Sequence, residues 1–275
     1  MRICTLGDLL LDVIVRQEEE PATPAYERRA QTLVGAGGQA ANVAAWTVTV
    51  GAEARFVGKR GTDAAAEIAT REVEERGVEV VGPLAEGRNG VVVSIVGADG
   101  GRTMISDRGI APELRAEELD LDWFRGCEWL HIAGYSLFRG PIDEAAAKAV
   151  GAIRALGGRL SVDLSSASAI EVFGADRLLD RLALLSPDVV FANEDEQRAL
   201  GATVPDAVTV LKRGPHGIVV DEVSFPALPA DVVDSTGAGD ALAAGFLVGG
   251  AQLALETAAR CVGQLGAMPP ATRPA

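Results

Sequence analysis

From residue 112 onward, short apolar segments alternate with segments of helical periodicity. Segments such as 129–132, 159–162 and 188–191 are too short for buried helices and do not show the polar alternation of a half-exposed strand. Helical segments separate them, so successive strands would run parallel, with helices packed on both faces of the sheet. The alternation therefore predicts an α/β fold with three α/β/α layers and a mostly parallel central sheet.

The first part of the chain contains β-rich segments that do not fit this alternation. Strands are expected over 2–6 and 9–15, and residues 97–101, which include Asp-Gly, are expected to join two β-rich runs as a hairpin. The simplest arrangement is a single domain over 1–275. In this domain, segments at about 9–34 and 88–110 would form a small inserted β lid.

The remaining periodicity predicts further helices. One is expected over 112–124, and two separate helices are expected over 238–248 and 253–265. Glycines or charges interrupt the longest apolar runs, so we expect none of them to reach the ~18 residues that a membrane span needs. The first residues lack the layout of a signal peptide.

The charge balance argues against two classes of partner. The chain carries 39 Asp and Glu against 25 Lys and Arg, a formal net charge of −14. Nucleic acids and anionic membranes would be repelled by such a surface, so neither is expected as a main partner. An anionic ligand would need a locally positive site made of backbone amides, a few cations or a metal ion.

Cysteine usage favours a reducing compartment. Cys4, Cys127 and Cys261 are odd in number and show no C-x-x-C spacing, so a disulfide framework or a zinc site is not expected. We expect these thiols to be reduced and mostly buried, which favours a cytoplasmic location.

The strongest chemical signal is the segment DSTGAGDALAAGF at 234–246. A turn rich in glycine and hydroxyl groups leads directly into an Ala-rich helix, and consecutive amides at a helix N-terminus bind anions. A capped helix without a ligand is the alternative, because Ser, Thr, Gly and Asp are all good cap residues. That alternative does not explain Asp240, a carboxylate placed beside an anion pocket, whereas taking a proton from an attacking hydroxyl would.

A second Gly-rich segment, GAGGQAANVA at 35–44, formally matches the dinucleotide-binding fingerprint. We reject a Rossmann oxidoreductase, because no apolar strand precedes this segment and no clear acidic partner follows it. The segment is instead expected to be a turn that lets a ligand approach a helix start. Asn occurs at only three positions in the chain, so a ligand-facing role for Asn42 is more plausible than simple exposure.

Several other enzyme classes are excluded by missing motifs. The sequence contains no P-loop, no H-E-x-x-H and no G-x-S-x-G, and it has only two histidines. His131 lies in a strand-like run and is expected to be a core residue.

Taken together, the motifs resemble those of the ribokinase-like (PfkB) carbohydrate kinase family. The segments at 35–44 and 234–246 are similar to the two signature regions of that family. The supporting motifs follow in family order along essentially the whole chain: Gly7-Asp8 with Asp12, GGRT at 100–103, HIAGY at 131–135, SVDLSS at 161–166, NEDE at 193–196 and KRGPHG at 212–217.

The resemblance implies transfer of the γ-phosphoryl group of ATP to a hydroxymethyl group of a small sugar. By residue-to-residue match, Asp240 would be the catalytic base, and the amides of Gly237, Ala238 and Gly239 would be the anion hole. Positive potential would then come from amides and Mg²⁺ rather than from net charge.

The other matches imply binding roles. Asp12, Gly38 and Asn42 would hold sugar hydroxyls, and Asp163 would have a weaker role beside substrate or phosphate. Asn193 and Glu196 match an element of the magnesium and phosphate environment, with Glu196 acting through water. The residues implied to bind the nucleotide are Lys212, Gly214, Gly217 and Thr236, and Asp234 would lie near a site for a monovalent cation such as K⁺.

The acceptor and the assembly are less constrained. Arg102 and Arg108 lie on the predicted lid hairpin. If either points inward it would bind an acidic sugar such as a 2-keto-3-deoxy sugar acid, whereas outward-pointing arginines favour a neutral sugar or a nucleoside, and we expect the neutral acceptor. The resemblance also implies a homodimer formed through the lid. The non-enzyme alternative is an inactive module that binds a sugar or a nucleotide.

Overall fold

We describe a computed structural model of the chain, covering residues 1–17, 29–97 and 102–271. Its larger sheet has the strand order β13-β12-β11-β10-β9-β8-β1-β4-β5. Only β12 and β13 run antiparallel to their neighbours. The strands of this sheet are β1 (Arg2–Leu6), β4 (Glu53–Val57), β5 (Glu79–Val81), β8 (Trp129–Ala133), β9 (Arg159–Asp163), β10 (Val189–Asn193), β11 (Val208–Lys212), β12 (Ile218–Val220) and β13 (Val223–Phe225).

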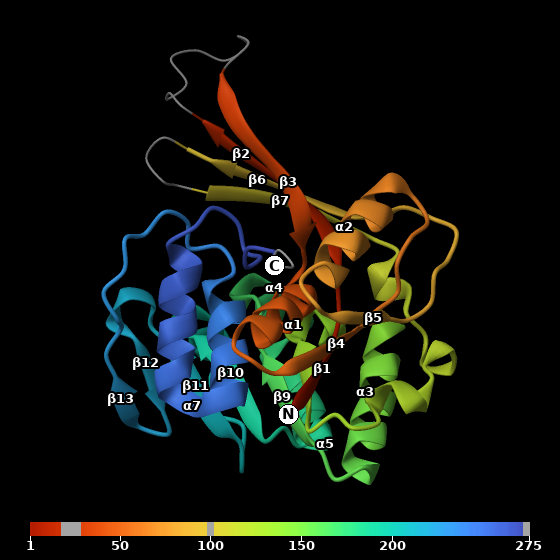
Figure 1. Cartoon of the computed structure of the whole chain (residues 1–275). Helices are drawn as coiled ribbons and strands as arrows, with labels where there is room; N and C mark the ends of the chain where they lie inside the picture. The colour runs from red at the N-terminus through yellow and green to blue at the C-terminus, as the bar shows by residue number, and fades with distance from the viewer. Residues whose placement is uncertain (18–28, 98–101, 272–275) are drawn as a thin grey trace.

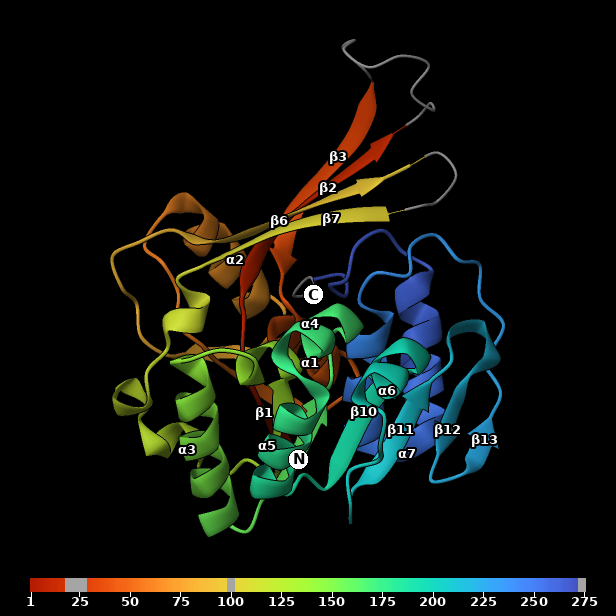
Figure 2. The same cartoon turned by 180° about the vertical axis from the view of Figure 1, so that it is seen from behind.

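Helices cover both faces of this sheet, so the predicted three-layer arrangement is confirmed. Helices α1 and α7 lie on one face of the sheet (Figure 1), and α3, α5 and α6 lie on the other (Figure 2). The apolar side chains of these two groups of helices belong to separate core clusters. The helices are α1 (Gln39–Thr49), α2 (Ala64–Glu74), α3 (Ile142–Ala155), α4 (Ala167–Phe173), α5 (Ala175–Leu185), α6 (Glu194–Leu200) and α7 (Ala238–Val262).

A second, four-stranded sheet projects from one end of the body (Figure 1). Its order is β3-β2-β6-β7, and β2 pairs with β6 in parallel although the other two pairings are antiparallel. Its strands are β2 (Leu10–Gln17), β3 (Ala30–Gly37), β6 (Asn89–Val96) and β7 (Arg102–Gly109). These strands lie in the two segments predicted as a lid, except that β3 continues past residue 34 to Gly37. Residues 18–28 and 98–101 of these segments lie outside the described part of the chain.

Two sequence-based expectations are corrected by the backbone. Residues 112–124 do not form one helix but three 3-10 turns, η1 (Ala111–Glu113), η2 (Ala116–Glu118) and η3 (Leu121–Phe124). The chain is extended at Leu114 and Leu119, with ψ of 124° and 123°, and this interrupts any longer helix. The strand β3 was not expected, because its side chains are mostly exposed and it lacks an apolar pattern. As an antiparallel strand of the small sheet, β3 is not the parallel strand that a dinucleotide fingerprint requires before α1.

Helix α7 contains an interruption close to the predicted one. Its backbone leaves helical geometry at Gly249 and Gly250, so two helical parts meet at a kink. Within the described residues, α7 is the one helix that meets the length and composition of a membrane span. This corrects the expectation that no segment would do so. In this fold the helix packs along the sheet and buries apolar side chains such as Leu247 and Leu255.

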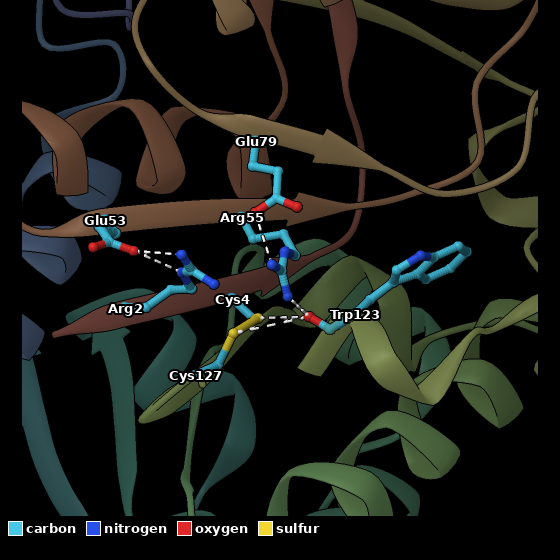
Figure 3. The surroundings of a disulfide bond; sticks show 7 residues. All are labelled: Arg2, Cys4, Glu53, Arg55, Glu79, Trp123 and Cys127. Carbon is cyan, nitrogen blue, oxygen red and sulfur yellow. Dashed lines mark hydrogen bonds and ion pairs between the residues drawn. A yellow bond between two sulfur atoms is a disulfide. The ribbon is translucent and has the colours of Figure 1, made fainter. Parts of the chain in front are cut away.

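The cysteines are not all reduced, which corrects a further expectation. Cys4 in β1 and Cys127, just before β8, form a disulfide with their Cα atoms 5.9 Å apart (Figure 3). Cys261 is a free, buried thiol. The sequence contained no signal for this pair, because the two residues are 123 positions apart and become neighbours only when β1 pairs with β8. Because two of the three cysteines are joined in a disulfide, the cysteines no longer indicate a reducing compartment.

Reducing this disulfide should destabilise the fold. Closing a loop of this length restricts the unfolded chain, so the Cys127→Ser variant should lose about 2–5 kcal/mol of unfolding free energy. Urea denaturation of the wild type with and without reductant, beside the variant, measures this. The variant should not respond to reductant, and wild-type midpoints that coincide in both conditions would contradict the prediction.

Candidate active site

The carboxyl ends of three neighbouring parallel strands bring polar side chains to one edge of the large sheet. Asp163 ends β9, Asn193 ends β10 and Lys212 ends β11. In open α/β sheets, ligands bind outside this edge, close to the point where the strand order reverses direction. Here that reversal lies between β1 and β8, because the chain continues from β1 to β4 on one side and from β8 to β9 on the other.

Helix α7 begins at this edge with a tight glycine turn. Gly237, its N-cap, has φ of 76°, and a Cβ there would lie 2.6 Å from the Cβ of Ala267, so only glycine fits. The Ala238 amide makes a long bond, 3.3 Å, to the Ser235 carbonyl. Amides of the first turn have no acceptor within their own helix, so the turn is able to donate to an anion; its role as an anion hole stays a prediction.

Asp240 lies in the first turn of α7 and is 8% exposed. Its Oδ2 accepts a hydrogen bond of 2.7 Å from Nδ2 of Asn42, which comes from the first turns of α1. The pKa of Asp240 is raised to about 7, mainly by burial; the hydrogen bond from Asn42 and the charge of Lys212 oppose this rise, and the charges of Asp163 and Asp12 add to it. A carboxyl group with a pKa near neutrality is suited to accept a proton in catalysis.

The pH dependence of turnover should follow this pKa. A base must be ionised, so kcat/KM should fall about tenfold per pH unit below the pKa of the free enzyme and level off above it. With the pKa of Asp240 at about 7, half of the plateau value is expected near neutral pH. Initial rates from about pH 5 to about pH 9 at low acceptor concentration test this. A profile that stays nearly level down to about pH 5, as a base with the ordinary Asp pKa of 3.8 would give, would exclude Asp240 as the titrating base.

Lys212 places a cation beside the glycine turn. Its Nζ lies 2.6 Å from Oδ2 of Asp163 and 3.8 Å from Oε2 of Glu196. The same nitrogen lies 3.4 Å from where a Cβ would stand on Gly239. Burial by itself would lower the pKa of Lys212, but Asp163 and Glu196 raise it above its usual value, so the side chain is an ammonium ion.

Asn193 and Glu196 form a reciprocal capping box at the start of α6. Asn193 Oδ1 accepts from the Glu196 amide, and the Glu196 carboxylate accepts from both the backbone amide and Nδ2 of Asn193, each at 2.8 Å. Burial raises the pKa of Glu196. Because both carboxylate oxygens already accept hydrogen bonds, the geometry fits a contact to Mg²⁺ through water better than direct ligation. No cluster of three or more metal-ligating side chains occurs within residues 1–17, 29–97 and 102–271.

Asp234 and Thr236 hold together the loop before α7. Asp234 Oδ1 accepts from the amide and the hydroxyl of Thr236, and Oδ2 accepts from the Gly266 amide at 3.0 Å. The carboxylate therefore ties the α7 turn to the C-terminal segment. Its suggested role at a monovalent cation and the role of Thr236 at the nucleotide stay predictions.

The three residues predicted to bind hydroxyls lie between the small sheet and the start of α1. Gly38 has φ of 95°, and a Cβ there would lie 2.5 Å from the Asp8 carbonyl oxygen. A Cβ on Gly37 would overlap the Asp12 carboxylate, so Asp12 lies across this glycine, and burial raises its pKa to about 7. Asp12, Gly38 and Asn42, predicted together as hydroxyl-binding residues, all lie at the start of α1 or against it.

Arg108 points inward from the end of β7. Its guanidinium pairs with the buried carboxylate of Asp8 and lies 3.8 Å from the ring centroid of Tyr135. The side chain of Arg102 lies outside the described part of the structure. The sequence contained Asp8 and Tyr135 within motifs, but it gave no sign that they would neutralise and stack on Arg108.

A cavity of about 800 Å³ opens on the other side of the glycine turn. Asn193, Lys212 and Gly239 line one part of it, and aliphatic side chains of α7 and of residues 227–232 line the rest. Gly214 borders this cavity with a φ of 52°. Gly217 also borders it, but a Cβ there would lie 2.0 Å from the Phe225 carbonyl, so the approach of β13 also requires this glycine. The polar and aliphatic parts match the phosphate and base ends of a nucleotide.

His131 occupies the core beneath the site, as predicted. Its Nδ1 lies 3.0 Å from Oγ of Ser161 on the neighbouring strand, and burial lowers its pKa to about 4. The ring is therefore neutral near neutral pH.

Sequence reasoning missed the support behind the glycine turn. Trp46 Nε1 donates to the Ala267 carbonyl at 2.8 Å, and Ala267 fills the space against Gly237. The C-terminal segment thus fixes the turn from behind. One of only three tryptophans in the chain was the available signal, but its partner was 221 residues away.

Comparison with known proteins agrees with this geometry. A family model described as pfkB family carbohydrate kinase matches residues 1–268. The chain is 29% identical to an ATP-dependent ribose-1-phosphate kinase from Halopiger xanaduensis, with 95% of this chain and 90% of that protein covered. It is 28% identical to a fructokinase from Escherichia coli, with 93% and 86% covered. The solved adenosine kinase from Sinorhizobium meliloti has a TM-score of 0.86 at 26% identity, with 97% and 95% covered.

Proposed function

Because the chain belongs to the pfkB family of carbohydrate kinases and has a ribokinase-like fold, we propose that it transfers the γ-phosphoryl group of ATP to a hydroxymethyl group of a small neutral sugar or sugar-like acceptor. One observation carries this proposal. Asp240, a buried carboxyl group, lies in the same helical turn as the amides of Gly237, Ala238 and Gly239, with the Lys212 ammonium beside them.

The residues act by placing charge where the reaction needs it. The ionised Asp240 accepts the proton of the attacking hydroxyl as the bond to phosphorus forms, and the bond to the leaving ADP oxygen breaks. The amides of the α7 turn and the Lys212 ammonium stabilise the negative charge of the transferred group. Glu196 would contact a bound Mg²⁺ through water, and the ion would supply positive charge that offsets the charge of the phosphates.

The charges on the acceptor side favour a neutral substrate. Asp8 cancels the charge of Arg108, and Asp12 and Asp240 add two carboxyl groups that face the same region. Arg108 and Lys212, the cations described beside these carboxyl groups, are already paired with Asp8 and Asp163, so an anionic acceptor would be repelled. Carboxyl oxygens accept hydrogen bonds from neutral hydroxyls without needing charge on the ligand.

The inward position of Arg108 supports a second class of acceptor, one that carries a negative charge. The ribose-1-phosphate kinase similar to this chain acts, by its name, on a phosphorylated sugar. For such a substrate, or for a 2-keto-3-deoxy sugar acid, Arg108 would have to exchange Asp8 for the anion of the acceptor. Replacing Arg108 with Ala should then raise KM strongly for the anionic acceptor, whereas an unchanged KM would remove this alternative.

ADP formation measured against an acceptor panel tests the proposal. The panel contains neutral ketoses and pentoses, nucleosides, sugar acids and sugar phosphates, each with Mg²⁺ and ATP and with a chelator as control. We expect one neutral acceptor to dominate and the chelator to abolish turnover. ATP binding without turnover of any acceptor would favour the inactive sugar- or nucleotide-binding module. Nicotinamide binding by fluorescence titration would favour the rejected oxidoreductase.

The outer face of the small sheet supports the proposal of a homodimer. Val13, Val93 and Ile105 lie side by side across β2, β6 and β7, on the face opposite Asp12, and Ile105 is 59% exposed. A second copy of this chain would cover this apolar row. The Ile105→Lys variant should therefore halve the molar mass measured by light scattering, while Met104→Lys, on the other face of the sheet, should not. A wild-type monomer at micromolar concentration would contradict the proposal.

Two further proposals concern activation by a monovalent cation and the location of the protein in the cell. K⁺ near Asp234 would activate the enzyme, which a comparison of rates in K⁺ and Li⁺ salts at equal ionic strength tests. A cytoplasmic location, where ATP is available, is proposed on the basis of the donor.

A further inference from the structure

Two helix N-termini from opposite ends of the sequence converge on the proposed base. Helix α1 starts at Gln39 after Gly38, and α7 starts at Ala238 after Gly237. Asn42 and Asp240 lie in the first turns of these helices and are 5% and 8% exposed. A contact between them is therefore shielded from water. In such a buried environment a hydrogen bond to an ionised group is stronger than in water.

The contact engages one defined oxygen of the carboxylate. Asn42 Nδ2 donates to Oδ2 of Asp240 at 2.7 Å, a short distance typical of a bond to a charged acceptor. This is the side-chain hydrogen bond that acts on the pKa of Asp240, and it lowers that pKa. With Oδ2 held by the amide, Oδ1 would be the oxygen left to accept the hydrogen bond of an acceptor hydroxyl.

The other end of the same amide is a buried acceptor. Oδ1 of Asn42 has no hydrogen-bond partner among the described residues. An unpaired buried carbonyl oxygen costs about 1–3 kcal/mol, so a ligand hydroxyl beside Asp240 would be favoured to donate to it. The amide can thus contact the base and a ligand at once.

We propose that Asn42 is the positioning residue of the catalytic base, because its amide fixes the orientation of the Asp240 carboxylate and favours its ionised form. The proposal rests on the proposed kinase function. It differs from the role that the resemblance implies, in which Asn42 only holds sugar hydroxyls. If Asn42 only bound the acceptor, its loss would raise KM and leave the ionisation of Asp240 unchanged.

The charged surroundings give the direction of each expected change. Asp12 from β2 and Asp163 from β9 oppose ionisation of Asp240, and Lys212 from β11 favours it. Cys261 from α7, whose pKa burial raises to about 12, is a neutral thiol near neutral pH. Removing the Asn42 donor should raise the pKa of Asp240, whereas removing the Asp12 charge should lower it.

The test compares the pH profiles of kcat/KM for a graded set of variants. Loss of a hydrogen bond to a charged group should move the acidic limb of Asn42→Ala upward by about one to two pH units. Asn42→Asp has the same shape but can add a negative charge, so its limb should lie higher still. Asp12→Asn should move the limb below that of the wild type. Thr49→Ala, at the far end of α1, serves as the control with an unchanged profile.

A second measurement does not depend on turnover. In protein carrying ¹³C-labelled Asp carboxyl groups, the resonance that disappears in Asp240→Asn reports the titration of Asp240, and it should shift in the same order among the variants. The proposal is overturned if Asn42→Ala raises KM but keeps the wild-type limb and the wild-type ¹³C titration. A wild type that phosphorylates no acceptor would instead contradict the proposed function, and the ¹³C titration would still decide whether Asn42 controls the ionisation of Asp240.

Discussion

Replacing Asp240 with Asn should lower kcat by about 10²–10⁴-fold, the usual loss when a general base is removed. The amide keeps the shape of the carboxyl group and can still accept from Asn42, but it cannot take the proton of the attacking hydroxyl. Acceptor and nucleotide binding should be largely kept. Steady-state kinetics together with calorimetric measurement of acceptor binding separate the two effects. A kcat close to that of the wild type would exclude Asp240 as the base.

Stability provides the control for this variant. Burial raises the pKa of Asp240 from 3.8 to about 7, so the folded state holds its proton more tightly than the unfolded state. The stabilisation is full below the lower value and is lost as pH rises through the higher one. Above neutral pH the wild type carries a buried charge that the variant lacks. Asp240→Asn should therefore melt no lower than the wild type there, and exposed Asp206→Asn should keep full activity.

Replacing Lys212 with Met should lower kcat by about 10²–10³-fold, the range found when one preorganised charge-stabilising donor is removed. The ammonium lies beside Gly239 at the turn where the transferred group would bind, and negative charge on that group is stabilised most in the transition state. KM for the acceptor should change little. Lys148→Met on the surface of α3 controls for the general loss of a cation. A loss in KM for ATP alone, with kcat unchanged, would limit Lys212 to nucleotide binding.

The Lys212→Met variant must be compared with a double variant, because the single substitution leaves the buried Asp163 carboxylate without its cation. Removing one member of a buried ion pair costs about 3–5 kcal/mol of stability. The double variant Lys212→Met with Asp163→Asn removes both charges of the pair. Its stability should recover toward the wild type while kcat stays low. Recovery of kcat in the double variant would mean that the single variant failed through the unpaired carboxylate.

The fold was largely predictable because its signals are local. Strands such as β8 and β9 are short apolar runs, and helix starts such as Asp63 before α2 carry their own cap residue, so neighbouring residues suffice to place them. The errors fall where local pattern and tertiary context differ. Residues 112–124 contain helix formers, but the chain extends at Leu114 and Leu119. Strand β3 has an exposed, polar sequence, and its pairing with β2 determines its structure.

The strand and helix pattern, the glycine turn before α7 and the place of Asp240 in its first turn could be read from the sequence, because each depends on residues a few positions apart. Which groups act on that carboxylate depends on contacts that form only in the folded chain. Asn42 is 198 residues away from Asp240, and Asp163 is 49 residues away from Lys212. The Cys4–Cys127 disulfide likewise joins residues far apart in the sequence, 123 positions from each other. Hydrogen bonds and ion pairs act over a few ångströms in space. The local pattern of a single sequence does not show which distant residues the folded sheet brings within that distance.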